Sequence, residues 1–74
     1  MSSKLTQRQE KFAVLVVEFE SATAAYEHAY PRSQHWKRKS IHEEASRLLA
    51  TPKIATRVQA LRNARQAEFE AEIR

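Results

Sequence analysis

The chain contains no glycine, and this absence restricts its fold more than any other feature of the sequence. Glycine is the residue that most readily adopts the positive φ angles of two-residue β-hairpins and left-handed turns. Proline occurs only as Pro31 and Pro52, so residues that break helices are also scarce. We therefore expect the 74 residues to form one small all-α domain rather than a sheet.

Two helices are predicted before Pro31. The first begins after Thr6, whose side chain can form a capping box with Gln9. Its apolar side recurs at helical spacing, in Phe12, Leu15, Val16 and Phe19. The β-branched valines in this run leave a strand as a less favoured alternative. Ser21 is a good N-cap for a second helix, Ala22 to Ala29, which Pro31 ends. The small side chains of this helix allow close packing on the next, as in a helix-turn-helix pair.

The third helix follows a basic segment. Ser40 and Glu43 have the spacing of a capping box, which predicts a helix that starts at or before Ile41. Its apolar stripe contains Ile41, Ala45, Leu48 and Leu49, and it ends at Thr51. Ser33 is an alternative cap that would start the helix earlier. We favour the later start, after an irregular basic loop, because positive charge in a first helical turn opposes the helix dipole.

The fourth helix is predicted to have Thr51 as its N-cap and Pro52 as its first residue. An apolar stripe runs along its first half, in Ile54, Val58 and Leu61. Phe69 and Ile73 lie on a rotated face, which predicts an exposed helical extension or an oligomer contact. No C-cap signal precedes the final Arg74, so we expect residues 1–74 to be one domain at the N-terminal end of a longer subunit.

The net charge of +4 is unevenly distributed. Among residues 1–20, the bases and acids cancel: Lys4, Arg8 and Lys11 against Glu10, Glu18 and Glu20. The excess lies later, where Arg32, Lys37, Arg38 and Lys39 occur without an intervening acid. Such a cluster predicts an anionic partner, either nucleic acid or a membrane surface.

The position of this cluster, directly before an amphipathic helix, favours DNA. Phosphate contacts from the four bases would give affinity, and exposed residues near the helix start would contact base edges. The predicted DNA-binding residues are Arg32, His35, Lys37, Arg38, Lys39, Ser40, His42 and Arg47. Arg47 has an alternative role in an intrahelical ion pair with Glu43 or Glu44. Trp36 either packs the loop onto the core, which we favour, or contacts nucleic acid.

Signals of catalysis are weak. No cysteine is present, so neither a disulfide nor a zinc–thiolate site can form. His28, His35 and His42 are separated by the helix break at Pro31, which argues against a shared metal site. We find no nucleophile with a neighbouring base and no glycine-rich phosphate loop, and we expect a protein without cofactor, metal or catalytic activity. The longest apolar run, Phe12 to Val17, is too short to cross a bilayer, so we expect a soluble intracellular protein.

Three segments occur in a familiar order: LTQRQEKF, SATAAYEHA and ASRLLATPKIATRVQALR. Together they resemble the N-terminal helix-turn-helix domain of bacteriophage terminase small subunits. The matching residues are Leu5, Thr6, Gln9, Phe12, Ala22, Thr23, Ala25, Ser46 to Leu49, and Pro52. The chain departs from the family pattern at Ala29-Tyr30-Pro31, where the family has Ala-Gly-Tyr, and the segment that leads to Ser40 is longer than usual.

The resemblance implies a small four-helix domain with a helix-turn-helix core and a C-terminal helical extension. It also implies a non-catalytic subunit that recognises double-stranded DNA at the viral packaging site and delivers it to the terminase large subunit, which carries the ATPase and nuclease. Homo-oligomerisation through segments after this domain and a location in the host cell cytoplasm are further implications. A transcriptional regulator with the same fold, or a helical module for protein interaction or membrane surfaces, remains the alternative.

Overall fold

The computed structural model describes residues 5–73, with side chains for residues 5–69, and within this range it has four α-helices, one short 3-10 helix and no strand. The elements, in order, are α1 (Gln7–Phe19), α2 (Ala22–Ala29), η1 (Pro31–His35), α3 (Arg38–Ala50) and α4 (Pro52–Ile73). The prediction of a small all-α domain is therefore confirmed.

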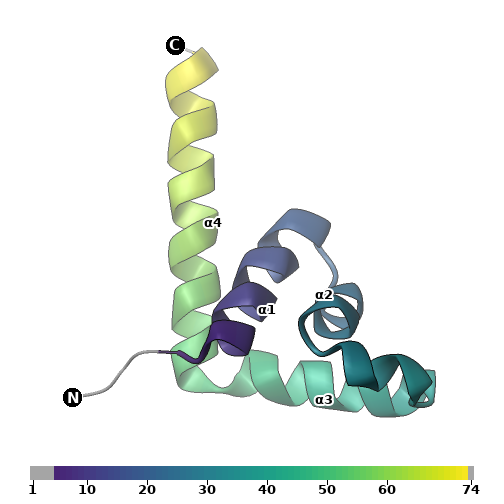
Figure 1. The fold of residues 1–74 in the computed structure, drawn as a ribbon. Helices are drawn as coiled ribbons and strands as arrows, with labels where there is room; N and C mark the ends of the chain where they lie inside the picture. The colour runs from purple at the N-terminus through teal and green to yellow at the C-terminus, as the bar shows by residue number, and fades with distance from the viewer. Residues whose placement is uncertain (1–4, 74) are drawn as a thin grey trace.

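The helices form an open, flattened assembly with extents of 45 × 32 × 18 Å. Figure 1 shows α3 along the base, with α1 and α2 above it and α4 rising from its end beside α1. The second half of α4 continues beyond the other helices, as the helical extension was predicted to do. Each of the first three helices therefore packs on its neighbours, while α4 packs through only part of its length.

The predicted start of α1 is confirmed. Thr6 Oγ1 accepts a hydrogen bond from the Gln9 N–H at 3.1 Å, and Gln9 Oε1 accepts one from the Thr6 N–H at 2.9 Å. The valines lie within the helix, so the alternative of a strand is wrong. Phe12 and Val16 are buried, whereas the ring of Phe19 is 41% exposed and packs edge-on against His28.

Helix α2 also has its predicted cap, because Ser21 Oγ accepts the Ala24 N–H at 3.2 Å. The helix ends before Tyr30 and Pro31, and Ala25, Tyr26 and Ala29 are buried on its inner side. The connection from α2 to α3, residues 30–37, is longer than the three or four residues of a typical helix-turn-helix turn. Within it, Ser33 is buried and its Oγ donates to the Tyr30 carbonyl at 2.7 Å, which stabilises η1.

Thr51 alone joins α3 to α4. Its carbonyl accepts the Ala55 N–H at 2.9 Å, and Pro52 is the first residue of α4, as predicted. The Thr51 hydroxyl, however, donates to the Arg47 carbonyl at 3.2 Å and so stabilises the end of α3 rather than the start of α4. This single residue thereby satisfies polar groups of both helices at the corner between them.

The core is small and depends on alanine. Its largest fully buried apolar side chains are Phe12 and Ile54, and fully buried alanines let the helices approach closely: Ala13, Ala25 and Ala45. Ile54 and Val58 attach α4 to this core, whereas Phe69 is 61% exposed on the extension. Predictions about the side chain of Ile73 lie outside the described residues.

Candidate nucleic-acid interface

Helix α3 begins before Ile41, as predicted, but its cap is not the predicted Ser40. Lys37 has the extended backbone of an N-cap, φ −66° and ψ 145°, and its carbonyl accepts the Ile41 N–H at 3.1 Å. Arg38 is therefore the first helical residue, and Ser40, in the third position, does not cap the helix. Neither Ser40 nor Ser33 is the cap, and the predicted irregular loop is instead η1 followed by two extended residues.

A packing contact explains why the earlier start is tolerated. Trp36 directly precedes the cap, and its ring lies 6.0 Å from the ring of Tyr26 on α2. Such an aromatic contact is worth about 1 kcal/mol, whereas a positive charge beside the N-terminus costs only about 0.3–1 kcal/mol and less in salt. The packing of Trp36 is thus comparable in size to the cost of placing Arg38 and Lys39 in the first turn, and it offsets that cost.

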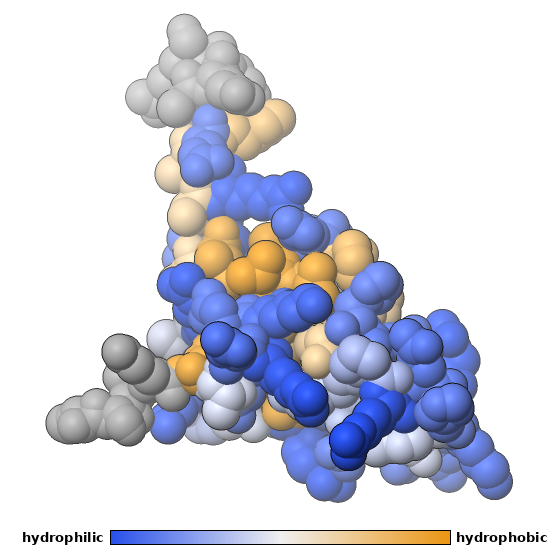
Figure 2. All heavy atoms as spheres, in the orientation of Figure 1, coloured by the Kyte–Doolittle hydropathy of each residue, from blue (hydrophilic) through white to orange (hydrophobic). Residues whose placement is uncertain are grey.

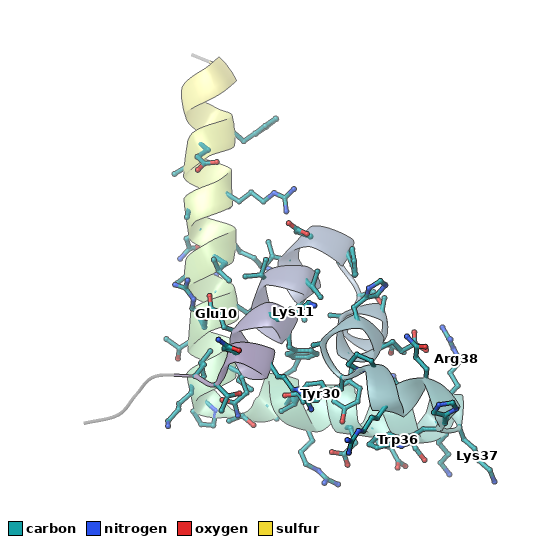
Figure 3. All side chains as sticks on the ribbon, viewed as in Figure 1. Glu10, Lys11, Tyr30, Trp36, Lys37 and Arg38 are labelled. Carbon is teal, nitrogen blue, oxygen red and sulfur yellow. The ribbon has the colours of Figure 1, made fainter. Side chains whose placement is uncertain are left out.

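The four bases of the predicted cluster are all exposed: Arg32 in η1, Lys37 at the N-cap, and Arg38 and Lys39 in the first turn of α3. Lys37 and Arg38 lie at the end of the molecule farthest from α4 (Figure 3). Within residues 5–69, ion pairs form at Arg47 and Arg57, and none involves these four side chains. The cluster is therefore open to an external anion.

The start of α3 also carries unused hydrogen-bond donors. No side chain caps the helix, so the N–H groups of its first turn keep the partial positive charge of a helix N-terminus. The neighbouring lysine and arginine side chains add full charges at the same end. Backbone and side-chain donors together match the oxygens of a phosphodiester group.

The remaining predicted residues lie in different surroundings. His35, at the end of η1, is exposed. His42 is exposed on α3, with its Nδ1 3.5 Å from the Thr23 hydroxyl of α2. Ser40 is half-buried. Arg47 pairs with Glu44 at 3.0 Å, so the structure contains the intrahelical alternative, and a phosphate contact from Arg47 stays a prediction.

Beyond its first turn, α3 is not uniformly basic. Glu43 is exposed and Glu44 half-buried, and both line a shallow hollow of about 620 Å³ together with Trp36, Lys37 and Ser40. Acidic side chains at this point repel a phosphate backbone. The positive surface therefore belongs to the connection and the first turn of α3, and not to the whole outer side of the helix.

Three aromatic rings form a row from this hollow toward α1. Tyr26 lies between Trp36, at 6.0 Å, and Tyr30, whose ring stacks on it at 4.6 Å. Burial raises the pKa of Tyr26, and the charge of Glu44 raises it further. Burial also raises the pKa of Tyr30, which the nearby Arg8 partly offsets. Trp36 has the favoured packing role, since its ring lies against Tyr26; it stays 44% exposed, and its contact with nucleic acid stays a prediction.

Sequence reasoning missed Arg8. Its guanidinium carbon lies 5.9 Å from the centre of the Tyr30 ring, a distance typical of a cation–π contact. The charges of residues 1–20 cancel in number, but Glu10 belongs to another side of α1, where it pairs with Arg57 of α4 at 2.9 Å. The spacing of Arg8 and Lys11, three residues apart on one helix, was the signal that could have found them.

Figure 2 shows how apolar and hydrophilic side chains are distributed over one face of the molecule. Apolar side chains gather along the seam between α1 and α4, whereas hydrophilic ones cover the region of α2 and the start of α3. None of the helices described is long and apolar enough to cross a bilayer. Within the described residues, no three histidine or carboxylate side chains are grouped as metal ligands.

Comparison with known proteins finds no match. No protein-family model, no curated protein and no solved structure is similar to this chain at a significant level.

Proposed function

We propose that this chain binds double-stranded DNA through the segment that enters α3 and through the first turn of that helix. The observation that carries the proposal is the group of four exposed bases, Arg32, Lys37, Arg38 and Lys39, which have no ion-pair partner within residues 5–69. Their charges surround an uncapped helix N-terminus, and the phosphates of DNA suit both kinds of donor.

Within this proposal, the chain is the DNA-binding part of a viral terminase small subunit. The support is the order of the three sequence segments, together with two helices in contact, α2 and α3, in the place of the helix-turn-helix pair. Such a subunit recognises the packaging site, carries no catalytic group and passes the DNA to a large subunit with ATPase and nuclease activity. It acts as a homo-oligomer in the host cytoplasm.

The test is fluorescence anisotropy of a labelled duplex at several salt concentrations. Each phosphate neutralised contributes about 0.9 to the slope of log K against log salt. The double substitution Lys37→Ala with Arg38→Ala is expected to lower this slope by about 1–2. A control, Lys53→Ala with Arg62→Ala on α4, removes the same net charge and is expected to keep most of the slope. Equal slopes for the two doubles, or no binding by the wild type at low salt, contradict the proposal.

A separate experiment distinguishes the terminase from a transcriptional regulator of the same fold. Copurification with a packaging ATPase and assembly into a ring support a terminase. Selection of a palindromic site by a tight dimer supports a regulator instead. Binding to anionic vesicles without any DNA affinity supports the membrane-surface alternative.

A further inference from the structure

The two sides of α1 carry opposite charge. Glu10 accepts three hydrogen bonds from the Arg57 guanidinium, at 2.9–3.1 Å, and so is directed to α4. Figure 3 shows Glu10 on the α4 side of the helix and Lys11 on the other side, toward α2. Arg8 also lies on this second side, over the ring of Tyr30. Glu18 and Glu20 are at the far end of α1. Glu10, the acid between these two bases in the sequence, is therefore paired with Arg57 on the opposite side of α1.

The aromatic row links these bases of α1 to the cluster at α3. From Arg8 the contacts run to Tyr30 at 5.9 Å, on to Tyr26 at 4.6 Å and to Trp36 at 6.0 Å, and Lys37 follows Trp36 in the chain. Tyr30 is half-buried and Trp36 is 44% exposed, so both rings reach the surface between the two groups of cations. The row of rings thus connects two basic groups from distant parts of the sequence, and Glu43 and Glu44 lie on the α3 side of Trp36.

We infer that this surface of α1, Arg8 and Lys11, is a second DNA-contacting element that binds backbone phosphates alongside the start of α3, with Trp36 in contact with the DNA between them. The inference rests on the proposed function and extends it to a helix outside the helix-turn-helix pair. Cations flanking exposed aromatic rings suit a nucleic acid, because the cations take phosphates and the rings pack on sugars or bases.

The experiment compares three double variants on one duplex. Arg8→Ala with Lys11→Ala is expected to lower the salt slope by about 1–2, as Lys37→Ala with Arg38→Ala does, while Lys53→Ala with Arg62→Ala does not. The charge-preserving double Arg8→Lys with Lys11→Arg is expected to keep the wild-type slope. Circular dichroism of each variant verifies the fold, since Arg8→Ala also removes a contact with Tyr30.

Trp36 is the only tryptophan of the chain, so its fluorescence reports on this surface directly. Quenching by acrylamide is expected to fall at least twofold when the duplex is added, because the exposed ring becomes covered. This readout needs no substitution, and it remains valid if a variant at Trp36 does not fold.

The outcomes separate this inference from the function on which it rests. If Lys37→Ala with Arg38→Ala lowers the slope but the α1 double behaves like the α4 control, the inference is wrong and the proposed function stands. If the wild type does not bind, both are wrong. If the complex forms but acrylamide quenching of Trp36 is unchanged, Trp36 does not contact the DNA.

Discussion

Glu20 is the residue with the most unusual backbone, since its φ of 56° and ψ of 29° place it in the left-handed region at the end of α1. Glycine normally takes this position, because it has no Cβ and a Cβ costs about 1 kcal/mol there. The carboxylate also lies at the negative end of the helix dipole. We predict that Glu20→Gly raises the free energy of unfolding by roughly 0.5–1 kcal/mol, measured by urea denaturation.

Glu18→Gly is the matched control, because it removes the same charge from a residue with helical backbone in the last turn of α1. Glycine there is expected to lower stability by about 1 kcal/mol. If Glu20→Gly lowered the free energy of unfolding as much as Glu18→Gly does, the assignment of a left-handed conformation to Glu20 would be wrong.

The two stacked tyrosines give the protein a defined response to alkaline pH. Burial raises the pKa of Tyr26 and of Tyr30 above the ordinary value of 10.0. The folded chain thus keeps protons that the unfolded chain has lost, so the stabilisation is complete below pH 10 and decreases as the pH rises through the folded-state pKa values.

Tyr26→Phe removes the part of this response that comes from Tyr26. We predict that thermal denaturation between pH 9 and pH 11 shows a steeper loss of stability in the wild type than in Tyr26→Phe. Parallel curves for the two proteins would contradict the assignment of the alkaline response to this ring.

At the scale of the element, caps were predictable where the local sequence alone determines them. The capping box at Thr6 and the cap at Ser21 are both present, each formed by residues three apart in the sequence. At Ser40, the same kind of signal failed, since the packing of Trp36 on Tyr26 starts α3 earlier, at Arg38. The contact between Trp36 and Tyr26 joins residues ten apart in the chain, whereas a capping-box pattern covers only four residues, so the pattern cannot predict it.

The failed capping box gives a direct test. We predict that Ser40→Ala changes the free energy of unfolding by less than about 0.5 kcal/mol, because its hydroxyl caps no helix. Ser21→Ala is expected to cost about 1 kcal/mol, since its Oγ accepts the Ala24 N–H. Urea denaturation of both variants measures the difference, and equal losses would mean that Ser40 caps α3 after all.

At the scale of the whole molecule, the apolar faces were predictable and the charged faces were not. Helical spacing correctly placed Phe12, Ala25, Ile41 and Ile54 in the core. On α1, however, it included the exposed Phe19 and left out the buried Ala13 and Val17. The candidate interface was found only in part, because counting charges along residues 1–20 gives zero. Glu10 pairs with Arg57, which is distant in the sequence, and so faces α4. Arg8 and Lys11 lie on the other side of α1.

The attachment of α4 determines whether the domain unfolds as one unit. Ile54 is fully buried in the core formed by α1, α2 and α3, while the second half of α4 extends away from it. We predict that Ile54→Val lowers the free energy of unfolding by about 0.5–1.5 kcal/mol. The loss should appear equally in circular dichroism, which follows all helices, and in the fluorescence of Trp36, which lies in the connection before α3.

The two probes separate the possible outcomes because Trp36 and Ile54 belong to different parts of the molecule. Trp36 packs on Tyr26 of α2, and Ile54 lies at the start of α4. If Ile54→Val shifted the transition seen by circular dichroism but left that of Trp36 unchanged, α4 would unfold separately from the other helices. Coincident shifts mean that the small, alanine-rich core folds cooperatively and that the aromatic row depends on α4 for its position.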